Sequence, residues 1–281
     1  MIRQQLSARI CAPIRAALGL LALAFLGLLA PEARAIEIRE ITSPGGIRAW
    51  LVEDHSIPFT ALSVMFRGGA SLDPPGRRGE VNLMTALLEE GSGDMDSVRY
   101  AEAVEALGAV TRFDVTDDAL VVGARLLSEN RDRAADLLAQ ALTRPRFDPD
   151  AVERVRAQVR SVIRSEATDP NAIATKELAR QAWGEHPYGS SINGTEQSVA
   201  ALTVADLRDA QARVLARDRV VVAAAGDITP EDLGRLVDRV LGGLPEKGSA
   251  PLPAPARLQL TGVVTVIDWY SPQTVVAFAQ E

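Results

Sequence analysis

The chain has 281 residues, of which 47% are hydrophobic and 24% are charged, and a formal net charge of −7. This composition is typical of a globular protein and excludes a disordered chain, and the excess of acidic residues argues against nucleic acid or an anionic membrane as a partner. The only cysteine, Cys11, lies near the N-terminus, so the rest of the chain can form neither a disulfide nor a thiolate metal site.

The first 35 residues have the three-part pattern of a secretory signal peptide. Arg3, Arg9 and Arg15 precede the apolar run 16–30. Ala33-Arg34-Ala35 follows it and matches a cleavage site. The apolar run is shorter than the roughly 18 residues that a spanning helix needs. Cleavage after residue 35 would remove four arginines and one glutamate, leaving 26 basic and 36 acidic residues and a net charge of −10. We therefore expect a periplasmic protein with no stable membrane anchor after cleavage.

Hydrophobic periodicity and turn residues predict an ordered domain after the signal. We expect strands at 36–41, 47–52, 60–66, 110–115, 119–126 and 219–225. We expect helices within 79–91 and at 97–107, 131–142, 149–166, 171–183, 203–215 and 229–241. Together these elements predict an α+β domain over residues 36–245, with a mainly antiparallel sheet packed against helices.

A proline-rich segment follows this domain. Residues 242–255 contain four prolines and three glycines, which is typical of a linker, and we place the linker at 246–257. Beyond it, 258–268 and 274–279 have the composition of strands and resemble the opening hairpin of the mature chain. We therefore expect residues 258–281 to begin a second, similar domain that is incomplete.

The helix predicted within 79–91 separates two faces at offsets of three, four and seven residues. Its apolar face consists of Leu83, Met84, Leu87 and Leu88. Its second face carries Asn82, Thr85, Ala86 and Glu89. A catalytic zinc ion needs three protein ligands, and the single carboxylate of this face cannot supply them.

Several short blocks stand in a characteristic order along the mature chain. They are Arg67-Gly68-Gly69-Ala70, the stretch 79–91, Leu107-Gly108-Ala109, His186-Pro187-Tyr188-Gly189, Gly194-Thr195-Glu196, 202–207 and Gly226-Asp227-Ile228-Thr229. In this order they resemble the M16 family of zinc metallopeptidases, the insulinase or pitrilysin group, and in particular its bacterial periplasmic members of two-domain length. The resemblance covers nearly all of the mature chain and implies the fold of that family.

The residues that carry the chemistry of the family differ in this chain. Active M16 peptidases have an inverted zinc motif, His-x-x-Glu-His, in the helix after the glycine-rich turn. The matching positions here are Asn82, Thr85 and Ala86. The third ligand of the family, a glutamate in a later helix, falls at 161–163, which is Ser-Val-Ile, and Glu166 is the nearest carboxylate. The resemblance therefore implies a member without catalytic residues, metal ligands or a cofactor of its own.

Many M16 peptidases pair a zinc-bearing subunit with a similar subunit that lacks zinc, around a chamber that holds an unfolded peptide. The resemblance thus implies two partners, a zinc-containing M16 subunit and an unfolded peptide. In the family the peptide adds to the edge strand after the Leu-Gly-Ala turn. The corresponding residues here are Val110, Thr111, Arg112, Phe113, Asp114 and Val115. Main-chain hydrogen bonds at such an edge hold an extended peptide whatever its sequence, although 110–115 can also be a plain edge strand.

The resulting hypothesis is an exported, zinc-less M16 protein that is the non-catalytic, substrate-binding subunit of a heteromeric metallopeptidase. Two alternatives remain at this point: an active zinc metallopeptidase with displaced ligands, and a binding or scaffold protein with no part in proteolysis. His55 and His186, the two histidines of the chain, are predicted to lie in separate loops, and no Gly-x-Ser-x-Gly elbow supports a serine hydrolase.

Overall fold

A computed structural model describes residues 37–259, 262–270 and 272–280. The predicted signal peptide, 1–35, lies outside the described residues. Within them, no helix combines the length and apolar character that crossing a membrane requires.

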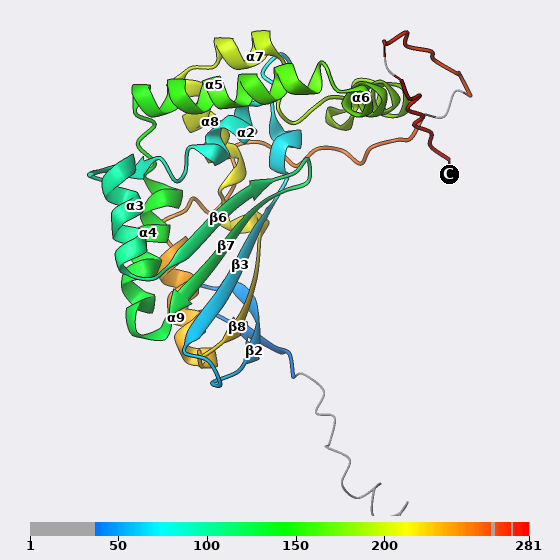
Figure 1. Cartoon of the computed structure of the whole chain (residues 1–281). Coiled ribbons are helices and arrows are strands. Elements are labelled where there is room, and N and C mark those ends of the chain that lie inside the picture. The colour runs from blue at the N-terminus through cyan, green and yellow to red at the C-terminus, as the bar shows by residue number, and fades with distance from the viewer. Residues whose placement is uncertain (1–36, 260–261, 271, 281) are drawn as a thin grey trace, which may run out of the picture. The chain divides into compact units, whose positions relative to one another are not determined.

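The centre of the fold is a six-stranded sheet in the order β1-β2-β8-β3-β7-β6 (Figure 1). Its strands are β1 (Arg39–Thr42), β2 (Arg48–Glu53), β3 (Phe59–Arg67), β6 (Val110–Val115), β7 (Ala119–Leu127) and β8 (Val220–Gly226). The pair β2–β8 is parallel and the other neighbouring pairs are antiparallel. The predicted α+β class with a mainly antiparallel sheet is therefore confirmed. A separate short hairpin joins β4 (Gly91–Ser92) to β5 (Met95–Asp96).

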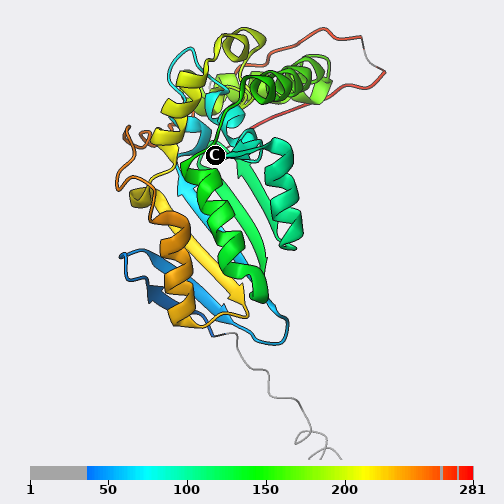
Figure 2. The same ribbon diagram turned by 90° about the vertical axis from the view of Figure 1, so that its left-hand side faces the viewer.

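Helices cover one face of the sheet. Figure 2 shows α4 (Arg131–Thr143) and α9 (Pro230–Leu241) side by side over the strands. The strands alternate accordingly: Leu62, Val64 and Phe66 of β3 are buried beneath the helices, whereas Ala61 and Ser63 are exposed on the opposite face. One face of the sheet is thus the core and the other is open.

The remaining helices lie mostly at one end of the sheet (Figure 1). They are α2 (Glu80–Ala86), α3 (Ser97–Ala106), α5 (Pro149–Glu166), α6 (Pro170–Trp183), α7 (Glu196–Ala201) and α8 (Val204–Val214), with the short 3-10 turns η1 (Gly69–Leu72), η2 (Ser128–Asn130), η3 (Pro187–Gly189) and η4 (Arg217–Arg219). Both α8 and α9 are capped at their N-terminal ends, because the hydroxyls of Thr203 and Thr229 each accept a backbone N–H from the first turn.

The strands predicted at 258–268 and 274–279 are wrong, because the described residues of both segments form no strand. They run instead beside α6, where the backbone N–H of Gln259 donates to the carbonyl of Ala182. A strand is stable only when it pairs with others in a sheet, and neither segment joins the edge of the six-stranded sheet. The domain limits 246–257 and 258–281 remain predictions.

Candidate functional site

The predicted motif helix is α2, a short helix that packs against β6 and α8. Gly79 begins it with a φ of 97°, a left-handed conformation that favours glycine. The carboxylate of Asp73 accepts the backbone N–H of Gly79 at 2.9 Å and that of Val81 at 2.8 Å. Burial raises the pKa of Asp73 to about 6, and these two N–H groups, followed by Arg78, act against the rise. The N-terminus of the helix is thereby fixed by a buried acceptor.

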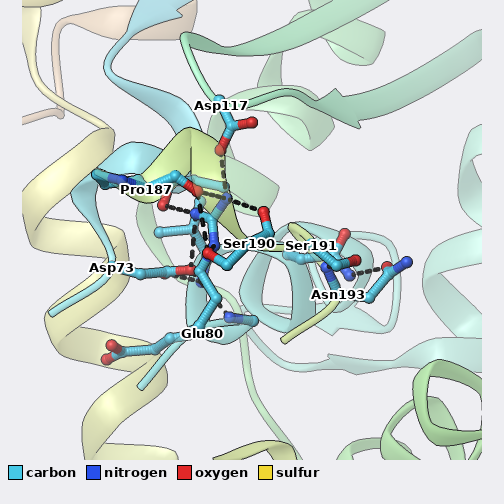
Figure 3. Close-up of polar contacts among 12 residues, drawn as sticks. Asp73, Glu80, Asp117, Pro187, Ser190, Ser191 and Asn193 are labelled. Atoms are coloured by element: carbon cyan, nitrogen blue, oxygen red, sulfur yellow. Dashed lines mark hydrogen bonds and ion pairs between the residues drawn. The ribbon is translucent and has the colours of Figure 1, made fainter. Parts of the chain in front are cut away.

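Two charged side chains tie α2 to its surroundings. Glu80 is fully buried and forms an ion pair with Arg213 of α8 at 2.8 Å. Arg78 donates to the carbonyl oxygens of Pro187 and Ser190 at 3.1 and 3.2 Å and also pairs with Asp117 in the turn between β6 and β7 (Figure 3). Through these contacts, Arg78 joins the segment before α2 to the 187–190 loop and to the β6–β7 hairpin.

The four residues predicted for the apolar face, Leu83, Met84, Leu87 and Leu88, are fully buried, although the last two follow the end of α2. The prediction for the second face is partly wrong. Thr85 is only 2% exposed, and its hydroxyl donates to the carbonyl oxygen of Val81 at 2.7 Å. Since α2 ends at Ala86, the predicted spacing does not extend to Glu89 on one helix. Ala86 and Glu89 are exposed.

Asn82 belongs to a chain of polar contacts that sequence reasoning did not find. Its amide Nδ2 donates to Oδ1 of Asn193 at 2.9 Å, and Nδ2 of Asn193 donates to Oε1 of Glu166 at 2.6 Å. Ser191 donates from its hydroxyl to the other oxygen of Glu166 at 3.3 Å, and Figure 3 shows Ser191 and Asn193 together in one loop. These hydrogen bonds connect α2 to the C-terminal end of α5 through the 190–195 loop.

The predicted third-ligand window lies on α5. Ser161 and Val162 are exposed and Ile163 is buried in the core, so the window contributes no carboxylate. Glu166, one turn further along, accepts the hydrogen bonds from Asn193 and Ser191. The nearest carboxylate to the window is therefore engaged by the protein itself.

The predicted peptide-binding strand has the same bounds as β6 and forms an edge of the sheet. Its residues are Val110, Thr111, Arg112, Phe113, Asp114 and Val115. The N–H of Thr116 donates to the carbonyl of Ala119 at 2.8 Å, which closes the hairpin to β7. Backbone groups alternate in direction along an antiparallel strand. Counted back along β6 from the hydrogen-bonded pair of Thr116 and Ala119, the backbone N–H and C=O groups of Asp114 and Arg112 point towards β7. Those of Phe113 point to the outer edge of the sheet. No strand pairs with that edge in the part of the chain that the structure describes.

The family model described as Insulinase (Peptidase family M16) matches residues 48–196, more than half of the chain, and the model described as Peptidase M16 inactive domain matches residues 201–281. This chain belongs to the M16 family. The resemblance inferred from the sequence is therefore confirmed, and α2 lies within the residues that the Insulinase model matches.

Several M16 relatives match at moderate identity. The Non-peptidase homolog YmxG of Helicobacter pylori is 26% identical over 222 residues, which cover 79% of this chain and 50% of that protein. The Uncharacterized zinc protease YmxG of Bacillus subtilis is 24% identical over 213 residues, covering 76% and 52%. The crystal structure of a peptidase M16 inactive domain from Pseudomonas fluorescens has a TM-score of 0.73 at 28% identity, covering 78% of this chain and 54% of that one. The chain thus spans about half the length of these relatives.

The residues at the M16 motif positions do not fit a zinc ion. The amide of Asn82 and the hydroxyl of Thr85 are both committed to hydrogen bonds within the protein, and Ala86 has no donor atom. A catalytic zinc requires three ligands that donate nitrogen, sulfur or carboxylate oxygen. Among the described residues, no three or more His, Cys, Asp or Glu side chains gather as a metal ion would require. No hydrolytic step can be assigned to these side chains.

The two histidines lie in separate loops. His55 places its ring nitrogens 2.6 Å from Asp227 and 3.0 Å from Glu53, at the opposite end of the sheet from α2. His186 packs edge-on against Tyr188, with ring centroids 4.4 Å apart. The prediction that the histidines occupy separate loops is confirmed.

Proposed function

We propose that this chain is the non-catalytic, peptide-binding subunit of a heteromeric M16 peptidase, exported to the periplasm and paired with a subunit that carries zinc. One observation supports the proposal above the others: β6 is an open edge strand directly beside a motif helix that has no metal ligands. In this role the chain supplies an edge that holds an unfolded peptide in extended form, and the partner supplies the hydrolytic chemistry.

The binding step depends on the main chain of β6. An added strand takes its hydrogen bonds from the outward N–H and C=O groups of alternate residues, Thr111, Phe113 and Val115. Their side chains are partly buried, and those of Phe113 and Val115 pack against the core, so the core fixes the strand while the edge remains available. Because main-chain groups make the contacts, peptides of different sequence can bind.

Substitution of Phe113 tests the binding step. Phe113→Pro removes one outward N–H without removing an N–H that donates to β7. We expect affinity for an unfolded peptide, measured by fluorescence anisotropy, to fall by up to about tenfold, because one main-chain hydrogen bond is lost. Phe113→Ala is the matched control, since it removes the same side chain and keeps the N–H. Equal affinity of the two variants would refute strand addition at β6.

Metal analysis of the purified mature chain tests the non-catalytic assignment. We expect no stoichiometric zinc after dialysis, because the motif positions carry an amide, a hydroxyl and a methyl group. One equivalent of zinc, together with chelator-sensitive cleavage of an unfolded peptide by the chain alone, would support instead an active metallopeptidase with displaced ligands.

Co-purification from the native source tests the partner. We expect an M16 subunit with an intact His-x-x-Glu-His helix to accompany the chain, and peptide cleavage to require both. A chain that binds peptide but never associates with such a subunit would support a scaffold or binding protein outside proteolysis.

A further inference from the structure

Two arginines stand side by side on the open face of the sheet next to the peptide-binding edge. In the register of β6 and β7, Arg112 is opposite Gly123 and Arg125 is opposite Val110. Arg112 and Arg125 are therefore diagonal neighbours whose side chains project from the same face. Both are exposed.

The space around these arginines is open. A Cβ atom added to Gly123 would meet nothing within 4 Å, and Ala61, which is opposite Arg125 on β3, is small and exposed. On the sides of Gly123 and Ala61, Arg125 is thus bordered by residues too short to cover its guanidinium. A strand added to the β6 edge would lie one spacing, about 4.8 Å, from Arg112 and two spacings, about 10 Å, from Arg125. The long side chain of Arg125 can span the second distance to meet a side chain of the added strand.

Neither arginine has an acidic partner in contact within the part of the chain that the structure describes. The ion pairs among the described residues engage most other arginines of the domain but neither Arg112 nor Arg125. The whole chain is acidic, with a net charge of −7, so two neighbouring positive groups that form no ion pair with any described residue contrast with the rest of it. Like charges on adjacent strands repel each other, and a ligand carboxylate would relieve that repulsion.

Acidic groups lie towards the other end of the same strand. Asp114 is exposed on the face that carries Arg112, and Glu89 is exposed just beyond α2. The pKa of Glu89 is raised first by desolvation and then by Glu90 and Asp114, while Arg112 lowers it. The edge is therefore positive near Val110 and Arg125 and negative near α2.

We propose that Arg112 and Arg125 recognise an acidic side chain of the peptide that adds to β6, so that the edge prefers peptides with an aspartate or glutamate directed to the open face. This inference rests on the proposed function of β6. Asp114 and Glu89 exclude the acid from the α2 end of the strand and so set the position of the peptide along the edge.

The test compares two fluorescein-labelled peptides of about nine residues, a usual strand length, in which valine and threonine alternate and the central residue is Glu or Gln. We expect the full mature chain to bind the Glu peptide about fivefold more tightly, which corresponds to a favourable exposed ion pair. Added salt should remove the preference by screening. Arg112→Gln and Arg125→Gln should each reduce it, and Asp114→Asn should increase affinity for the Glu peptide.

Arg133→Gln is the matched control, because Arg133 is an exposed arginine of α4 that takes part in none of these ion pairs, and the preference should survive it. Circular dichroism establishes that each variant is folded. Equal affinities for the two peptides, with affinity still lowered in Phe113→Pro relative to Phe113→Ala, would overturn the arginine recognition and leave the proposed function standing. Absence of binding by either peptide would overturn both.

Discussion

The motif helix α2 and the edge strand β6 are neighbours that differ in how their polar groups are used. In α2, the amide of Asn82 and the hydroxyl of Thr85 both bond within the protein. In β6, every second residue directs its backbone groups away from the sheet. Zinc catalysis needs particular side chains at particular positions, whereas strand addition needs a main chain in the right place. A chain can therefore lose the first capability and keep the geometry for the second.

The largest expected effect tests how firmly α2 is held. Arg213→Met leaves the buried carboxylate of Glu80 without its partner and should lower the free energy of unfolding by about 3–5 kcal/mol, measured with urea. Arg99→Met, in the exposed pair of Arg99 with Asp96, should cost less than about 1 kcal/mol. The double variant Glu80→Met/Arg213→Met should recover most of the loss. If Arg213→Met and Arg99→Met lower the free energy of unfolding equally, α2 does not depend on the pair of Glu80 with Arg213.

A smaller effect tests the hydrogen bonds that join α2 to α5. Asn193→Ala leaves Asn82 and Glu166 without their shared partner and should cost about 1–2 kcal/mol of unfolding free energy. A double-mutant cycle with Asn82→Ala should give a coupling energy of about 0.5 kcal/mol or more. Asn171→Ala, at the exposed start of α6, serves as the control. Strictly additive effects of the first two substitutions would mean that the contact contributes nothing to stability.

Amide hydrogen exchange distinguishes the N–H groups of β6 that point to the outer edge from those that donate to β7. The N–H groups of Thr111, Phe113 and Val115 should exchange at least about tenfold faster than those of Arg112 and Asp114, because only the latter donate to β7. Addition of a bound peptide should slow the fast set and leave the slow set unchanged. Uniform protection along β6 in the free chain would show that its outer edge is already occupied.

The smallest expected effect concerns pH at the end of the sheet remote from α2. Hydrogen bonds to Asp227 first, and then to Glu53, raise the pKa of His55 above its ordinary value of 6.5. The stabilisation is therefore fully present below that value and is lost as pH rises through the higher pKa of the folded state. The melting temperature of the wild type should exceed that of His55→Gln at about pH 6 and by less at about pH 9. Peptide affinity should not follow this difference.

Local signals predicted the elements of the fold well. Helix α5 and strand β6 match the prediction residue for residue, because Pro149 fixes the first turn of the helix and the turn at Asp117 and Asp118 ends the strand. The strand pattern of 258–268 was misleading, since alternation establishes a strand only when a partner strand is present.

The candidate site was predictable only in part. That the predicted motif positions carry no histidine or glutamate could be read directly from Asn82, Thr85 and Ala86. The contact between Asn193 and Glu166 could not, because it joins a loop to a helix end 27 residues away, and no periodicity relates the two. A signal was nevertheless present: Asn193 precedes Gly194, whose φ of 77° marks a tight turn that positions the amide.

The place of β8 in the sheet has a consequence for how the chain folds. β8 is the last strand of the sheet in sequence, yet it lies between β2 and β3 and pairs with both. Contacts of such long sequence separation form late and slowly. The edges of β2 and β3 that pair with β8 therefore stay uncovered until more than half of the described chain has followed them. Until then both edges can pair with other chains, and protection of the nascent chain up to Gly226 should decide how much of it reaches the native state.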